Sequence, residues 1–193
     1  MKEIIIKKQV YTYNELNDVA RENAKREWLE IYHTSEDYLE IIEDFLECDF
    51  PNSNLDVQFS LGCIQGDGVN IYGALHLKDI LNFNHNYYTL NDDCLDLIYK
   101  EFEKRQEFIE YIKLPYNNNC SYCVAENLEL PNYLNSDKFT PFKNYVINIF
   151  EDICKEFENK GYDFFYKIDD NVFIEICKRN KIYFYDNGNI FYD

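Results

Sequence analysis

Apolar residues alternate with polar or small residues in two neighbouring segments, residues 55–63 and 69–77. Such alternation is typical of strands that bury one face. The connecting residues are Ile64-Gln65-Gly66-Asp67-Gly68, and four of the six glycines, at positions 62, 66, 68 and 73, fall in or beside the two segments. This pattern predicts an antiparallel hairpin whose backbone needs positive φ angles or close approach between strands.

Helical spacing of apolar residues predicts five helices elsewhere. The first begins near Thr12, which has the capping-box spacing with Glu15, and runs to about Ile31. The second covers about residues 35–48, with Ser35 as its cap, and ends at Asp49-Phe50-Pro51-Asn52. We expect three more at about residues 91–113, from Pro141 to Gly161, and at about residues 170–180.

Further strands are expected at residues 3–10 and within residues 116–130. The chain closes with a second hairpin, residues 181–185 and 190–192, in which Asn187-Gly188 suits a type I′ turn. Together these elements predict an α+β fold with helices packed on one face of an antiparallel sheet. Because no linker or repeat interrupts residues 1–193, we expect a single domain.

The apolar segments and the cysteines indicate a cytoplasmic protein. No run approaches the ~20 apolar residues that span a bilayer, and the apolar stretch near the N-terminus is too short for a signal peptide. The seven cysteines are odd in number and scattered. We expect them to be reduced, buried thiols.

The formal net charge of −17, with 36 acidic against 19 basic residues, sets the class of partner. It argues against direct binding of nucleic acid or of anionic membranes, since both need a basic surface. It favours a basic protein partner, although acidity that serves solubility alone is the alternative. Spread evenly over a monomer of this mass, the net charge places only about 1.4 charges on an ~800 Å² interface. Imitation of DNA therefore requires the carboxylates to cluster.

Three segments resemble a family of small acidic proteins from phages and prophages, some of which carry the label antitoxin-like. These are an opening helix at residues 11–28, a Gln-Gly-Asp-Gly hairpin at residues 60–69, and a C-terminal hairpin at residues 180–190. The resemblance implies a mobile-element origin. It also implies a role such as countering host defence or acting in a toxin–antitoxin pair.

Two kinds of candidate binding residue stand out. Gln65, Gly66, Asp67 and Gly68 would offer exposed backbone N–H groups and two polar side chains, although a simple turn needs the same glycines. The second kind is acidic pairs, which are distant in sequence and must converge to form one face. They are Glu36-Asp37, Glu43-Asp44, Asp92-Asp93 and Asp169-Asp170. The last two pairs also stand where helices begin, where negative charge is favourable without any further role.

Cys120 and Cys123 form the one motif typical of a metal site, but no second CxxC or histidine pair accompanies it. The histidines at positions 33, 76 and 85 lack paired spacing, and neither a Walker loop nor a GxSxG motif occurs. We therefore expect no structural metal, no cofactor and no catalytic residues.

These observations lead to three hypotheses. The first is an inhibitor that presents an acidic surface to a basic, nucleic-acid-handling defence protein, such as a CRISPR effector or a restriction enzyme. The second is an antitoxin-like protein that neutralises another partner. The third is an enzyme whose site is assembled from residues distant in sequence, which a deep pocket with converging polar groups would favour. Sequence alone leaves the oligomeric state and the partner's identity open.

Overall fold

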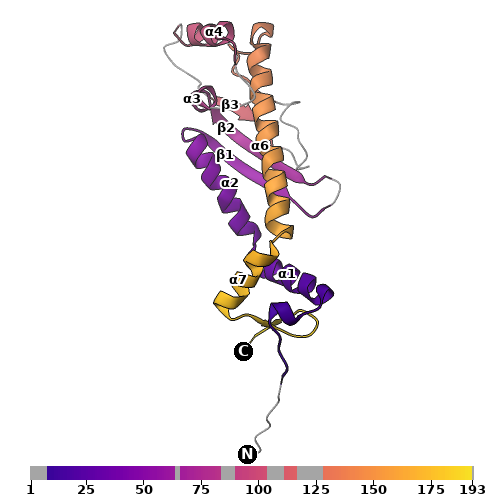
Figure 1. Ribbon diagram of the computed structural model, residues 1–193. Coiled ribbons are helices and arrows are strands. Elements are labelled where there is room, and N and C mark those ends of the chain that lie inside the picture. Colours follow the sequence, from indigo (N-terminus) through magenta and orange to yellow (C-terminus); the bar gives the residue numbers. More distant parts are fainter. Residues whose placement is uncertain (1–7, 64–65, 84–89, 104–110, 117–127, 193) are drawn as a thin grey trace, which may run out of the picture. The chain divides into compact units, whose positions relative to one another are not determined.

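The computed structural model describes residues 8–63, 66–83, 90–103, 111–116 and 128–192, and its elements are labelled in Figure 1. The chain divides into two compact units: unit 1 comprises Met1–Tyr38 and Tyr162–Asp193, and unit 2 comprises Leu39–Gly161. Helices, a three-stranded antiparallel sheet and a small hairpin confirm the α+β class. The expectation of a single domain stays a prediction.

Unit 1 combines elements from both ends of the chain. The N-terminal part contributes a 3-10 turn η1 (Tyr13–Glu15), helix α1 (Asp18–Tyr32) and the start of helix α2 (Ser35–Asp49). The C-terminal part contributes the end of helix α6 (Thr140–Tyr166), helix α7 (Asp170–Asn180) and strands β4 (Tyr183–Phe184) and β5 (Ile190–Phe191). Their buried side chains form one core, which consists of Tyr13, Leu16, Ala20, Ala24, Phe173, Cys177, Phe184 and Ile190.

The start of unit 1 corrects two predictions. Thr12 N and Oγ1 both donate to Glu15 Oε2 at 2.8 Å, so the capping box forms. It encloses only η1, because Leu16 is extended with ψ 149° and α1 begins at Asp18, capped by Asn17. The strand expected at residues 3–10 is absent from its described part, residues 8–10, and residues 3–7 lie outside the described residues. Pairing begins at Tyr11, which bridges Phe184.

The C-terminal hairpin is confirmed, with a different turn. Tyr183 pairs with Phe191 and Phe184 pairs with Ile190. Gly188 has φ +92°, whereas Asn187 does not have the positive φ that a type I′ turn requires. Gly188 N instead donates to Tyr185 O at 3.0 Å and Tyr185 N to Asn189 O at 2.8 Å, which fits a three-residue loop with glycine in the left-handed position.

The sheet of unit 2 confirms the central hairpin. Strands β1 (Asn54–Ser60), β2 (Gly68–His76) and β3 (Tyr111–Leu114) form an antiparallel sheet in the order β1-β2-β3. Leu55 and Leu114 lie opposite Gly73 from the two sides. The alternation of the sequence explains the pairing, since Val57, Ile71 and Ile112 are all buried.

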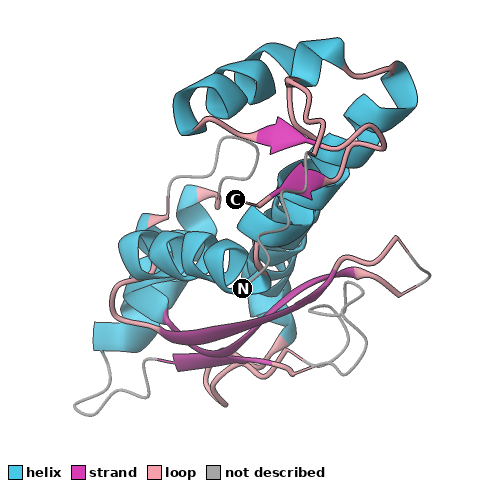
Figure 2. Cartoon of the chain, turned by 90° about the horizontal axis from the view of Figure 1, so that it is seen from below, coloured by secondary structure: helices cyan, strands magenta, loops and turns pink. Residues whose placement is uncertain are grey.

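Helices cover one face of this sheet in unit 2 (Figure 2). The thiol of Cys154 on α6 hydrogen-bonds the backbone of Ile71 on β2. The rings of Phe45 on α2 and Phe157 on α6 meet edge to face, with centroids 5.1 Å apart. The remaining elements of unit 2 are helix α3 (Leu77–Asn82), helix α4 (Asp92–Glu103) and the 3-10 turn η2 (Asp137–Phe139).

Several predicted boundaries in unit 2 are wrong. The helix expected at residues 91–113 ends at Glu103 as described, and Tyr111–Leu114 is a strand, because Ile112 and Leu114 pair with β2. Gly161 does not end α6, which continues to Tyr166 with Gly161 buried in it. Helix α3 was not predicted. The strand expected near residues 120–124 lies outside the described residues, and Glu129 bridges Lys113 beyond them.

The described cysteines are free, but burial is less general than predicted. Cys94, Cys154 and Cys177 are buried, whereas Cys48 and Cys63 are exposed. Burial raises the pKa of the Cys154 thiol to about 12 and that of Cys177 to about 11.

Among the described helices, none is both long enough and apolar enough to span a bilayer.

Candidate functional site

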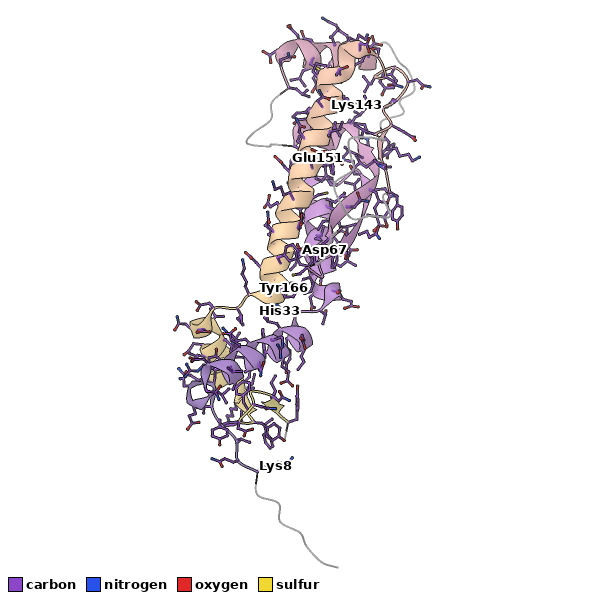
Figure 3. The ribbon with its side chains drawn as sticks, turned by 90° about the vertical axis from the view of Figure 1, so that its right-hand side faces the viewer. Lys8, His33, Asp67, Lys143, Glu151 and Tyr166 are labelled. Atoms are coloured by element: carbon purple, nitrogen blue, oxygen red, sulfur yellow. The ribbon has the colours of Figure 1, made fainter. Side chains whose placement is uncertain are left out.

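In the loop between β1 and β2, the carboxylate of Asp67 is buried and forms a hydrogen bond within the hairpin. Asp67 is only 8% exposed, and its Oδ1 accepts a hydrogen bond from Ser60 Oγ at 2.9 Å. Figure 3 labels Asp67 at the sheet, beside α6. Burial, and then the charge of Asp67, raise the pKa of Glu158 on α6. Gly66 is exposed and open, with φ +97°, Gly68 is buried, and Gln65 lies outside the described residues. The loop therefore presents Gly66 and keeps Asp67 inside.

The acidic pair of α7 serves structure in unit 1. Asp169 caps α7, with its Oδ1 accepting from Asn171 N at 2.8 Å and Val172 N at 3.2 Å. Asp170 Oδ1 accepts from Lys25 Nζ at 2.9 Å and from Tyr13 Oη at 3.1 Å. These contacts, the Lys25 hydrogen bond first, lower the pKa of Asp170. Both carboxylates are therefore engaged within the unit.

The pairs Asp92-Asp93 and Glu36-Asp37 also stand in first helical turns, whereas Glu43-Asp44 lies in the middle of α2. Asp92 and Asp93 are exposed at the start of α4, which Asn91 caps by accepting from Cys94 N at 2.8 Å. Thr34 Oγ1 accepts from Asp37 N at 3.2 Å, and Asp37 Oδ2 accepts from Thr34 N at 3.1 Å, so Thr34 rather than Ser35 caps α2. Since the pairs belong to two units, their predicted convergence stays a prediction.

Helix α2 carries a run of exposed negative charge within unit 2. Glu40, Glu43, Asp44 and Glu47 are exposed and follow the i, i+3, i+4, i+7 spacing that puts side chains on one side of a helix. None of the four forms an ion pair among the described residues. We call this set the acidic face.

The opposite side of α2 fixes the acidic face in place. Ile42 and Leu46 are 0% and 5% exposed, and they hold that side of the helix in the core of unit 2. Phe45 contacts Phe157 of α6, as described above, and the ring of Phe50 directly after the helix lies 5.4 Å from that of Phe150. The acidic face is therefore held on a packed helix and points to solvent.

A groove of about 610 Å³ adjoins the acidic face at the end of α2. The buried side chains of Leu46 and Phe50 contribute apolar lining, and the exposed Glu43 and Glu47 contribute carboxylates. The loop after α2 and the start of β1 complete the lining with Pro51, Ser53 and Leu55.

A buried carboxylate fastens the loop that borders this groove. Asp79 of α3 is 4% exposed, and it accepts from Asn52 N at 2.9 Å, Asn52 Nδ2 at 2.7 Å and Ser53 Oγ at 2.6 Å. Ser53 Oγ also accepts from His76 N at 2.9 Å, which ties the loop to β2. Charge-assisted bonds of this kind are about twice as strong as neutral ones. These hydrogen bonds within the fold thus hold the wall of the groove.

The described residues contain no group of three or more histidine, cysteine or acidic side chains that could hold a metal ion. Cys120 and Cys123, the CxxC motif, lie outside the described residues.

No protein-family model, no curated protein and no solved structure matches the chain.

Sequence reasoning found part of the acidic face and missed the rest. It selected Glu43-Asp44 as a pair but overlooked Glu40 and Glu47, which complete the helical stripe. Two signals were present. The carboxylates repeat with helical period, and the sequence has no lysine or arginine between Arg26 and Lys78.

Proposed function

We propose that the protein binds a basic, nucleic-acid-handling protein through the acidic face of α2 and inhibits it by occupying its phosphate-binding surface. The observation that carries this proposal is the stripe of four exposed carboxylates without a basic residue on the helix. An even spread of 17 net charges over the observed surface of 12,830 Å² would place only about one charge on an ~800 Å² patch. The acidic face exceeds that average several-fold.

The linear density of these charges supports imitation of a nucleic-acid strand. With a rise of about 1.5 Å per residue, the stripe from Glu40 to Glu47 places four charges over about 10.5 Å of helix axis, in steps of about 4.5, 1.5 and 4.5 Å. One strand of duplex DNA carries one phosphate per about 3.4 Å of its helix axis. The acidic face therefore has about the same charge per length as one DNA strand, although its carboxylates are unevenly spaced.

The biological setting of this proposal comes from the resemblance to phage and prophage proteins. It favours a host defence protein as the partner, of the kind that anti-CRISPR or anti-restriction proteins inhibit. A defence nuclease must present a basic surface to DNA, so it offers the complementary charge.

The test compares two variants with equal loss of charge. In the first, the acidic face is neutralised by Glu40→Gln, Glu43→Gln, Asp44→Asn and Glu47→Gln. In the control, four other exposed carboxylates of unit 2 are neutralised by Asp96→Asn, Glu129→Gln, Asp137→Asn and Glu156→Gln. Each immobilised protein is incubated with host lysate, and the captured proteins are identified. Each captured protein is then assayed for DNA binding with and without the same variant added in solution.

We expect the original protein and the control to capture the same basic protein and to displace DNA from it, and the acidic-face variant to do neither. Capture should also weaken as salt rises, because exposed charges are screened within about 8 Å at physiological ionic strength. Equal performance of both variants, or capture without displacement of DNA, would refute the proposal.

A further inference from the structure

The groove beside the acidic face has both apolar and negatively charged lining, and one kind of side chain is complementary to both. Its accessible apolar lining comes from Pro51, which is exposed, and Leu55, which is half-buried. Its carboxylates come from Glu43 and Glu47, which are one helical turn apart and exposed. A ligand that fills the groove therefore needs an apolar stem and a cationic head. Arginine and lysine have this form, since both lay an aliphatic stem along apolar surface while the charge stays in a polar setting.

The two carboxylates favour arginine over lysine. Side chains at i and i+4 of a helix have Cβ atoms about 6 Å apart, so one planar guanidinium with five N–H donors can reach both. An ammonium is a compact and strongly hydrated charge that cannot form the same fork. Guanidinium is also more weakly hydrated, which lowers the cost of leaving water for a half-enclosed site.

The rigidity of the groove adds to this match. The Phe50 ring is stacked on Phe83, with centroids 4.9 Å apart, and the Asp79 hydrogen bonds hold the loop of Asn52 and Ser53. A groove held in this way needs little reordering when it is filled, and binding to preorganised sites loses less conformational entropy.

We infer that this groove is the anchor site for an arginine side chain of the partner, with the stem over Pro51 and Leu55 and the guanidinium between Glu43 and Glu47. The inference rests on the proposed function and makes it more specific. It assigns the groove a different part from that of Glu40 and Asp44, which lie on the acidic face but do not line the groove. Arginine is among the residues that dominate binding energy at protein interfaces.

The test uses acetylated tetra-arginine amide as the probe and acetylated tetra-lysine amide as its control, each titrated into the full chain at low salt. Calorimetry gives the affinity, and methyl NMR signals of Leu46 and Leu55 report occupation of the groove. We expect tetra-arginine to bind at least about threefold more tightly than tetra-lysine and to shift both methyl signals. The E43Q/E47Q variant should weaken tetra-arginine binding about tenfold, and the matched E40Q/D44N variant about threefold or less.

Each outcome bears on the inference separately from the proposed function. Equal weakening by E43Q/E47Q and E40Q/D44N, equal affinity for the two peptides, or unshifted methyl signals would each overturn the arginine site. None of these results would touch the proposed function, which depends on partner capture and DNA displacement. All four substitutions are isosteric and at exposed positions, and the methyl shifts of the unsubstituted protein need no variant at all.

Discussion

Gly73 offers the sharpest test of the packing within the sheet. It lies in the central strand β2 with φ +120°, and a Cβ atom added there would stand 2.4 Å from Asn54 O and 3.2 Å from Leu55 Cα. These are backbone atoms of β1, and they cannot rotate away as a side chain would. Gly66, in the loop of the same hairpin, has φ +97° but meets no atom within 4 Å. Alanine substitution at the two positions thus separates the free-energy cost of a positive φ angle from the cost of a clash with the backbone of β1.

Gly66→Ala should lower the free energy of unfolding by about 1–2 kcal/mol, the cost of a left-handed angle for a residue with a Cβ atom. Gly73→Ala should cost that amount plus about 1–3 kcal/mol for overpacking, or about 2–5 kcal/mol in total. Whole domains are stable by only about 5–15 kcal/mol, so the larger loss is readily measured.

Urea denaturation followed by far-ultraviolet circular dichroism gives both free energies, and hydrogen exchange of the β1 and β2 amides localises the loss. If Gly73→Ala and Gly66→Ala prove equally costly to within about 0.5 kcal/mol, close approach of β1 is not what requires Gly73. A greater loss of unfolding free energy in Gly66→Ala than in Gly73→Ala would contradict a role for close backbone approach at Gly73.

Two further predictions concern pH and thiol reactivity. The fold lowers the pKa of Asp170, so its ionised carboxylate stabilises unit 1 at pH values above about 3.9, the pKa of an aspartate in the unfolded chain. This stabilisation is lost as the pH falls through the lower pKa of Asp170 in the folded protein. Fluorescence of Trp28, the chain's single tryptophan, should show an acid-induced loss of stability that Asp170→Asn reduces, and an unchanged profile would contradict this. With iodoacetamide at pH 8, Cys48 and Cys63 should be alkylated in the native protein and the buried cysteines should not, since burial disfavours their thiolates. Peptide mapping decides this, and native labelling of Cys177 would contradict it.

The elements that sequence predicted well are those whose patterns are local. Alternation over residues 55–77 specified the hairpin, although Asn70 and His76 of the expected polar face are buried, and the helix expected at residues 170–180 matches α7. Ile109 and Ile112 fit a helix and a strand equally well, and only pairing of Ile112 with β2 decides between them. Gly161 has the sequence signature of a helix end, but its position is buried inside α6, where packing overrides local preference.

The candidate site shows the same division between local and distant information. Helical periodicity contains the information for the whole acidic face, because it lies on one element, but only the pair Glu43-Asp44 was selected from it. The groove was beyond reach, since it needs Leu46, Pro51 and Leu55 from three consecutive segments and a loop fastened by Asp79 from a fourth. Asp67 was selected as a binding residue, but its hydrogen bond with Ser60 closes the turn.

The origin of unit 1 in both ends of the chain has a consequence for folding during synthesis. Tyr13 and Ala20 leave the ribosome long before Phe173 and Ile190, with which they share a core. All of Leu39–Gly161 is made in between, so unit 2 is complete before unit 1 has its second half. Closing a loop of that length costs roughly 4 kcal/mol of chain entropy if it is unfolded. Docking of α7 and the last hairpin onto α1 is therefore the final step, and until it happens the apolar side of α1 is open to chaperones.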